Sequence, residues 1–378
     1  MGFLNFLMDY IVPFLFILTA LVFVHELGHY LVARRNHVRI EVFSIGFGPE
    51  IYGWTDRVGT RWKISAVPLG GYVKMFGEDG MWDEEGKEKP LNDEDRAVSF
   101  PHKRLGQRFA IVAAGPIANF IFAVVLLAGL FGFVGNPSPL SGIGMVQPGS
   151  AAEEAGIKVG DMVLSINGEA IELFDDLRRI VSGYPGAPLK LVIRRDGVES
   201  TVSATPKRHK RIDKNGKEFE VGLLGVAPDP NHIRYERQGP LNAAWMAVEK
   251  SYELSTQILV ALGEIITGER TAGELGGPLR IAQISGEMAQ GGMANLIFFM
   301  AALSVNLGLI NLFPVPMLDG GHLVFYIVEF VLGRPISPRI QEYGFRFGLI
   351  LVLLLMVFAT WNDLVHLKVF EFIKQLIV

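Results

Sequence analysis

Long apolar runs dominate the chain, and four of them are long enough to cross a lipid bilayer. They cover about 10–33, 109–134, 295–313 and, with short flanks, 347–361. A helix of about 20 apolar residues spans the hydrocarbon core of a bilayer. Between the second and third runs, short apolar stretches alternate with turn residues, as in a small globular domain. We therefore expect an α-helical polytopic membrane protein with an inserted α+β domain.

The same pattern divides the chain into seven expected segments. They are transmembrane helix 1 (1–36), a membrane-associated β region with an acidic loop (37–106), transmembrane helix 2 (107–136), the inserted domain (137–230), amphipathic surface helices (231–293), transmembrane helix 3 (294–333), and transmembrane helix 4 with a C-terminal tail (334–378). The surface helices are too polar to span and are broken at Gly268 and at Gly276-Gly277-Pro278.

Alternation of apolar and polar residues between positions 40 and 76 predicts a pair of strands. The run Pro68-Leu69-Gly70-Gly71 suggests that they form a hairpin turning at Gly70-Gly71, with a sheet at the membrane interface. Residues 78–96 are crowded with acidic side chains and contain few apolar ones. We expect that stretch to be a solvated, mobile loop.

Basic residues orient the expected spans. They follow the first span, precede the second, and lie between the third and fourth: Arg34, Arg35, Arg39, Lys103, Arg104, Arg108, Arg334, Arg339 and Arg346. By the positive-inside rule these connections are cytoplasmic, so the inserted domain and both termini face outward. The net charge of −4 gives no indication of a nucleic-acid partner. The lack of cysteine excludes disulfides and thiolate zinc ligands.

The first apolar run contains His25-Glu26-Leu27-Gly28-His29, a His-Glu-x-x-His pattern. On a helix, residues four apart share a face, so both histidines can bind one zinc ion while Glu26 acts as general base. The pattern arises by chance in roughly one chain of this size in a hundred, and two buried histidines can be hydrogen-bonded core residues. A membrane span offers few such partners, and its ionisable groups usually mark a functional site.

A second polar run, residues 311–322, ends the third apolar segment. Pro314 and Pro316 interrupt the helix, so the backbone unwinds before Asp319. Asp319 is a candidate third zinc ligand, and Asn311 is an amide able to hydrogen-bond a substrate backbone. The alternative for Asp319 is a turn or cap residue of Asp319-Gly320-Gly321.

These two runs, together with Pro68-Leu69-Gly70-Gly71-Tyr72-Val73, resemble the site-2 protease family over nearly the whole chain. The resemblance implies a zinc metalloendopeptidase of the bacterial inner membrane with one Zn²⁺ per chain. It further implies cleavage of single-span membrane proteins, such as anti-sigma factors first cut by an upstream site-1 protease, and clearance of signal-peptide remnants. Both termini and the inserted domain would then be periplasmic.

A transmembrane substrate must unwind before cleavage, and its freed backbone groups then need new partners. The strand over 61–75 can supply them by strand addition, which makes Gly70, Gly71 and Val73 candidate substrate-binding residues. Pro314 and Pro316 would keep the region beside Asn311 from re-forming a helix. The competing interpretation is that this hairpin only anchors Trp54 and Trp62 in the interface.

The inserted domain resembles a PDZ domain, with its signature over residues 155–168. Residues 221–226 resemble the carboxylate-binding loop, which makes Leu224 and Gly225 candidate peptide-binding residues. That loop comes last, as in circularly permuted PDZ domains. Close relatives in the site-2 protease family that this chain resembles carry two tandem PDZ domains, whereas this chain has room for one. A PDZ domain that binds nothing and only screens access is equally compatible with the sequence.

Two other protein classes remain open. A membrane transporter or receptor with an intramembrane metal site has no need of Glu26 beside its histidines, whereas peptide hydrolysis has. A non-catalytic PDZ scaffold needs neither the histidine pair nor Asp319.

Overall fold

The computed structural model describes residues 3–78, 91–212, 218–229, 232–271, 273 and 276–366. Most of the expected acidic loop and the expected C-terminal tail lie outside the described residues. The chain divides into two compact units, one of residues 1–130 with 240–378, the other of residues 131–239.

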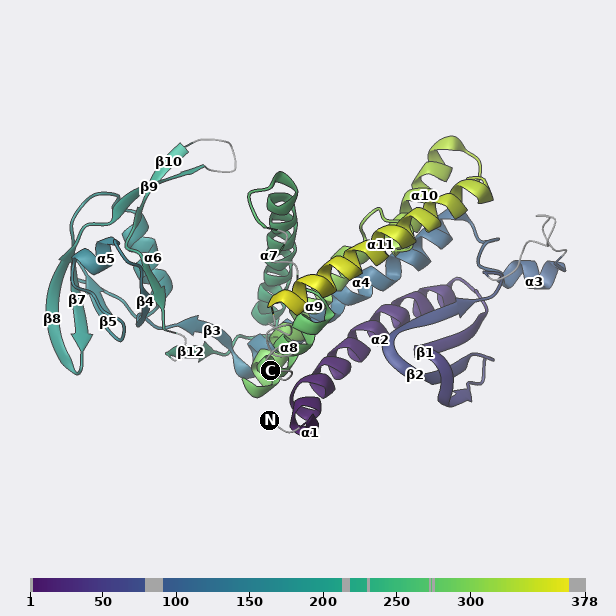
Figure 1. Ribbon diagram of the computed structural model, residues 1–378, viewed down its shortest axis with the longest axis horizontal. Helices are drawn as coiled ribbons and strands as arrows, with labels where there is room; N and C mark the ends of the chain where they lie inside the picture. Colours follow the sequence, from purple (N-terminus) through teal and green to yellow (C-terminus); the bar gives the residue numbers. More distant parts are fainter. Residues whose placement is uncertain are drawn as a thin grey trace, which may run out of the picture. The chain divides into compact units, whose positions relative to one another are not determined.

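The first unit is largely helical (Figure 1). Its helices are α1 (Phe3–Phe6), η1 (Leu7–Ile11), α2 (Val12–Arg35), α3 (Asp93–Val98), α4 (Leu105–Gly129), α7 (Pro240–Thr267), α8 (Pro278–Gln290), α9 (Met293–Asn311), α10 (Asp319–Leu332) and α11 (Pro338–His366), while η2 (Leu130–Val134) leads into the second unit. Among the described residues, four helical segments are long and apolar enough to cross a membrane: 7–35, 105–134, 293–311 and 339–365. The four apolar spans expected from the sequence are therefore present as helices.

Helix α4 packs between α2 and α9, and small residues permit this close approach. A Cβ atom at Gly28 of α2 would overlap the carbonyl oxygen of Ala114 in α4. On the other side, the hydroxyl of Ser304 in α9 donates to the backbone oxygen of Asn119 at 2.8 Å. Small side chains and buried hydrogen bonds are the usual means by which apolar helices associate in lipid.

The fourth long helix is joined to the short helix α8. The carboxylate of Asp363 is 1% exposed and accepts hydrogen bonds from the backbone N–H groups of Gly277, Leu279 and Arg280. Those N–H groups have no partner within α8, so the hydrogen bonds to Asp363 satisfy them. The negative charge of Asp363 also interacts favourably with the positive end of the α8 dipole. Helix α8 in turn packs against η1 and α2.

The β region is a long hairpin of β1 (Ile40–Thr55) and β2 (Arg61–Met75), which packs against α2 (Figure 1). The prediction that it turns at Gly70-Gly71 is wrong. The turn lies at residues 56–60, and the two glycines lie inside β2. In the strand register, Phe43 of β1 pairs with two residues of β2, Val73 and Trp62. The hairpin therefore folds back on itself.

Asp56 explains the position of the turn. Its carboxylate accepts the N–H groups of Val58 and Thr60, each at 3.0 Å. The indole N–H of Trp62 donates to it at 3.0 Å and the hydroxyl of Tyr30 in α2 at 3.3 Å. Aspartate commonly initiates turns by such local bonds. Burial by itself raises the pKa of Asp56, but these donors outweigh it and hold the pKa below its ordinary value.

The second unit is built from short strands and two helices. Its elements are β3 (Asn136–Pro139), β4 (Ile143–Val146), α5 (Ala151–Glu154), β5 (Met162–Ile166), β6 (Glu169–Ala170), α6 (Phe174–Ser182), β7 (Leu189–Arg195), β8 (Val198–Ala204), β9 (Lys207–Ile212), β10 (Glu218–Leu223), β11 (Val226–Pro228) and β12 (Ile233–Glu236). Four strands form a sheet in the order β6-β5-β7-β8, and the others pair as β9 with β10, β4 with β11, and β3 with β12.

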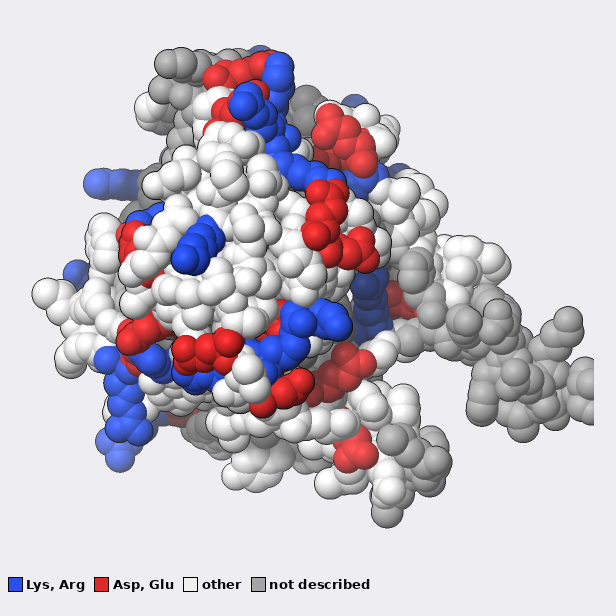
Figure 2. Space-filling view, turned by 90° about the vertical axis from the view of Figure 1, so that its left-hand side faces the viewer, with Lys and Arg blue, Asp and Glu red and all other residues white. Residues whose placement is uncertain are grey.

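The core of this unit lies between the sheet and α6, where Phe174, Leu177 and Leu191 are at most 4% exposed. Charged side chains of both signs lie next to one another on the face shown in Figure 2. Exposed ion pairs, such as that of Arg194 with Glu199, occur in this unit. A tight turn at Asp196-Gly197 joins β7 to β8, and α6 covers Phe174–Ser182.

Candidate metal centre

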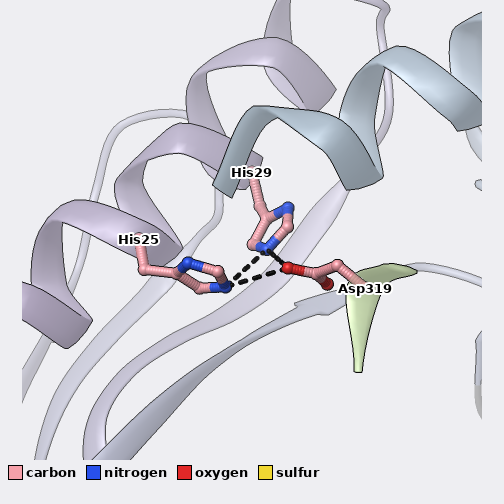
Figure 3. Close-up of side chains that lie close together, drawn as sticks. All are labelled: His25, His29 and Asp319. Carbon is pink, nitrogen blue, oxygen red and sulfur yellow. Dashed lines mark hydrogen bonds and ion pairs between the residues drawn. The ribbon is translucent and has the colours of Figure 1, made fainter. Parts of the chain in front are cut away.

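Three side chains from two distant parts of the chain meet in the first unit (Figure 3). Nε2 of His25 lies 3.2 Å from Nε2 of His29. Oδ2 of Asp319 lies 3.1 Å from the first nitrogen and 3.5 Å from the second. The histidines project from successive turns of α2, and Asp319 is the first residue of α10, after a backbone that is not helical over residues 312–318.

The three facing atoms all carry lone pairs. Nδ1 of His29 lies 2.8 Å from the backbone oxygen of Ile111 and donates to it, because a carbonyl can only accept. In the neutral ring, Nε2 is then the unprotonated nitrogen. Oδ2 of Asp319 is buried and has no hydrogen-bond partner among the described residues. Lone pairs that converge in a buried place repel one another unless a proton or a metal ion lies between them.

The spacing of these atoms suits zinc. With ligand bonds of about 2.0–2.1 Å, neighbouring ligands of a tetrahedral zinc ion lie roughly 3.3 Å apart. The three observed separations of 3.1, 3.2 and 3.5 Å bracket that value. Two imidazoles and one carboxylate also form a donor set typical of catalytic zinc, which leaves a fourth position for water. His25, His29 and Asp319 therefore fit a zinc ion.

Helix α4 supports the two histidines. Gly115 lies directly against them, and a Cβ atom there would overlap the imidazole of His29 and come within 2.9 Å of His25 Cε1. One turn later, the side-chain amide of Asn119 faces Nδ1 of His25 at 3.1 Å. Asn119 is fully buried.

The amide of Asn119 determines which nitrogen of His25 faces the metal position. Its nitrogen is placed opposite Nδ1, while its oxygen is buried without a partner among the described residues. The two amide atoms exchange places by a half-turn, and the hydrogen-bond network decides between them. With the oxygen facing Nδ1, Asn119 accepts the Nδ1–H of His25 and leaves Nε2 free, as in His29. Metal-binding histidines are usually oriented by such a second hydrogen bond.

These groups line a cavity of about 300 Å³. Its walls come from α2, β2, α4, α9, the segment between α9 and α10, α10, and residues that follow β2 and α3. The lining residues are His25, Glu26, His29, Tyr72, Val73, Met75, Glu78, Phe100, Val112, Asn311, Met317, Leu318, Asp319, His322 and Tyr326. Glu26 and Asn311 therefore lie at the same cavity as the three metal-binding side chains.

One edge of β2 faces carboxylates of this cavity. The backbone N–H of Val73 hydrogen-bonds to Glu26, and that of Met75 donates to Glu78 at 3.0 Å. Alternate residues of a strand direct their N–H groups to the same edge, so Gly71 belongs to this edge too. Gly71 also packs closely on α2, since a Cβ atom there would lie 3.3 Å from Cγ of Glu26.

Other predicted substrate-binding residues do not line the cavity. Gly70 packs against the ring of Phe47, Pro314 is exposed, and the backbone of Pro316 packs against Gly348 of α11. In the second unit, Leu224 is buried in the core and Gly225 follows it in the loop between β10 and β11.

Several residues at this site are not among those predicted from the sequence. Asn119 is one of them, although an amide in an apolar run is a recognised signal of a functional site. Tyr326 follows Asp319 by seven residues and shares its helix face, and its ring lies under the guanidinium of Arg108 at 5.0 Å. Arg108 also pairs with Glu329 at 2.6 Å, which ties α4 to α10. His322 lines the cavity outside the metal-binding cluster.

Comparison with known proteins gives close relatives. The sequence profile described as Peptidase family M50 matches residues 13–355. The protein named "Putative zinc metalloprotease R01501" of Rhizobium meliloti (strain 1021) is 46% identical over 362 residues, which cover 94% of this chain and 97% of that protein. "Metalloprotease MmpA" of Caulobacter vibrioides is 36% identical over 390 residues, covering 97% and 98%.

Among solved structures, the PDZ domain of the SdrC-like protein from Listeria monocytogenes aligns with 26% of this chain and 92% of that chain. The sequence identity is 16% and the TM-score is 0.18. A score of this size does not establish a shared fold.

Proposed function

The chain belongs to peptidase family M50 and is a zinc metalloprotease, and we propose that it hydrolyses peptide bonds within the transmembrane segments of single-span proteins. Family and apolar helices together indicate a multi-pass membrane protein. The proposal is carried by one cavity, which lies between helices long enough to span a membrane. In it the three metal-binding atoms lie together with Glu26 and with the edge of β2 that faces Glu26 and Glu78.

His25, His29 and Asp319 would hold the zinc ion, which when bound acts as a Lewis acid on water and on the scissile carbonyl. Glu26 is the general base that takes a proton from the attacking water, and it then returns a proton to the leaving amine. Before a substrate binds, the backbone N–H of Val73 holds the carboxylate of Glu26. Asn311, which lines the same cavity, would donate its amide to a substrate carbonyl.

A substrate helix must unwind to reach this cavity, and its freed N–H and C=O groups each cost several kcal/mol in an apolar setting unless they find partners. The edge formed by Gly71, Val73 and Met75 can pair with the unwound segment by strand addition. Glu26 and Glu78 now accept two of its N–H groups, and an incoming strand would take their place.

The resemblance to site-2 proteases and the positive-inside pattern extend the proposal to partners and location. The protein would lie in the bacterial inner membrane with both termini and the insert in the periplasm. Its substrates would be anti-sigma factors already cut by a site-1 protease, and signal-peptide remnants. The insert would act as a PDZ domain, with Leu224 and Gly225 in a loop for a terminal carboxylate, or would screen substrates by access alone.

The test is cleavage of a model transmembrane substrate by the purified full-length protein in detergent or liposomes. We expect cleavage within the membrane segment, inhibition by a zinc chelator, and recovery when zinc is added. A metal transporter or receptor, the rival class, would release or bind metal without cutting any substrate. Absence of cleavage by zinc-loaded protein across several transmembrane substrates would refute the proposed activity.

A further inference from the structure

A second cavity lies next to the catalytic one. It has a volume of about 340 Å³ and is lined by Met317, Gln341, Glu342, Phe345, Arg346 and Leu349. All but Met317 come from α11. Met317 lines both cavities, and the ring of His322, which lines the first, contacts the ring of Phe345 at 5.1 Å in the second. Met317 and the contact between His322 and Phe345 therefore lie at the boundary between the two cavities.

Met317 has an unusual backbone. Its φ angle is +103°, which is strained for a residue with a Cβ atom. The preceding Pro316 packs on Gly348 of α11, and the following residues lead into Asp319. The backbone at this point is thus held between α11 and the metal-binding residue. The side chain is 48% exposed and unbranched, so it can change rotamer while the backbone stays in place.

The lining of the second cavity indicates what it can accept. Met317, Phe345 and Leu349 supply apolar surface. The charges of Glu342 and Arg346 are paired with each other, and the amide of Gln341 donates to the backbone oxygen of Ile336 at 3.1 Å. With its charges neutralised in this way, the cavity favours an apolar side chain over a charged one.

We propose that this second cavity is a substrate subsite, which receives a large apolar side chain close to the bond that is cleaved, with Met317 at its entrance. The inference rests on the proposed function, because it assigns the occupant as part of the same substrate. An extended peptide advances about 3.3 Å per residue and directs successive side chains to opposite sides. A strand paired with β2 can thus keep its backbone in the catalytic cavity while one side chain crosses Met317.

The experiment uses one model transmembrane substrate whose cleaved bond has been mapped by mass spectrometry. Each of the four residues on either side of that bond is changed in turn to Ala, Leu, Phe or Asp, and kcat/KM is measured. We expect the wild-type protein to prefer Leu or Phe over Ala at one position by about tenfold or more, as an apolar pocket does. Asp at that position should be cleaved most slowly.

Leu349→Trp fills the cavity and should abolish this preference at that position alone, with zinc content kept. Phe345→Ala enlarges the cavity and should shift the preference toward Phe over Leu, which provides a second measurement if the tryptophan variant folds poorly. Leu354→Trp is the matched control, because Leu354 lies on the same helix, is 63% exposed and does not line the cavity.

The outcomes separate the subsite from the activity. If the wild-type protein cleaves the series but both cavity variants keep its selectivity at every position, the subsite proposal is wrong and the protease assignment stands. If the wild-type protein cleaves none of the substrates, both the proposed activity and the proposed subsite are wrong.

Discussion

At the residue scale, Glu26 is expected to act in peptide hydrolysis without binding the metal. Its carboxylate lines the cavity but is not one of the three atoms that fit the metal. Glu26→Gln should lower kcat by about 10²–10⁴-fold, the usual contribution of a general base, with zinc content unchanged. Metal analysis and cleavage rates measured on one preparation test this. Glu41→Gln, at a carboxylate that pairs with Lys74 away from the cavity, is the matched control. A fully active Glu26→Gln protein would contradict the assignment.

Asn119 is a positioning residue for His25. Replacing its amide by leucine removes the acceptor for Nδ1–H, so zinc affinity should fall by about 10–100-fold, as for other residues that orient a ligand. Asn119→Asp keeps an acceptor and should retain most of the affinity. Competition with a zinc-binding dye measures both variants without any assay of cleavage.

A control for this variant comes from α9. Ser304→Ala removes the hydrogen bond to the backbone oxygen of Asn119 but leaves its amide in place. If Ser304→Ala and Asn119→Leu weaken zinc binding equally, Asn119 acts only through helix packing.

At the element scale, the edge of β2 has two expected roles: it holds the carboxylate of Glu26, and it pairs with the substrate. Val73→Pro removes an N–H that bonds to Glu26 and that would pair with a substrate, so cleavage should be lost with zinc retained. Val73→Thr keeps the N–H and the branched shape, and it should remain active. Loss of cleavage alone does not distinguish the two roles.

The two roles separate when Glu26 is already replaced. In a Glu26→Gln background, substrate binding can be measured by crosslinking or fluorescence without turnover. Adding Val73→Pro should weaken this binding about tenfold or more if the strand holds the substrate. Equal binding by the single and double variants would mean that the hairpin is only an interfacial anchor.

In the second unit, an ion pair joins the start of β5 to the end of β7. The carboxylate of Asp161 is fully buried and accepts from Nε and an Nη of Arg195 at 2.6 and 2.7 Å. Burial alone raises the pKa of Asp161, but Arg195 and the N–H of Lys158 lower it below its ordinary value. A carboxylate with a depressed pKa stabilises the fold above pH 4–5, and this contribution is lost as the pH falls through the depressed pKa.

Arg195→Met should therefore destabilise this unit by about 1–3 kcal/mol at pH 7, because it leaves a buried carboxylate without its charged partner. The difference from wild type should shrink as the pH falls below about 4. Amide hydrogen exchange in β5 and β7 of the full-length protein measures both effects. Arg194→Met, in an exposed pair with Glu199, should cost at most about 1 kcal/mol. A difference that is independent of pH would contradict this account.

At the scale of the whole molecule, the metal centre lies toward one end of the first long helix. His29 precedes the basic residues Arg34 and Arg35, in the last turn of α2, by little more than one helical turn. If this end is cytoplasmic, as the charges predict, a membrane-impermeant chelator should inhibit the protease in inside-out vesicles and leave it active in right-side-out ones. Inhibition from the outside only would reverse the proposed orientation.

The sequence by itself determined the features that depend on short-range patterns. Four apolar runs predicted the four long helices, because bilayer thickness and helix rise fix the length of a span. The four-residue spacing of His25 and His29 placed them on one face of α2, and Asp196-Gly197 supplied the left-handed backbone of a tight turn. Each of these follows from residues that are close to one another in the sequence.

Tertiary structure decided what depends on contacts between distant segments. The hairpin turns at Asp56 rather than at Gly70-Gly71 because Tyr30 of α2 and the facing Trp62 complete the bonds of that carboxylate. The glycines are needed instead where β2 approaches α2 and Phe47. Asn119 meets His25 across 94 positions of sequence. Such contacts carry no local periodicity, so only the folded chain brings them together.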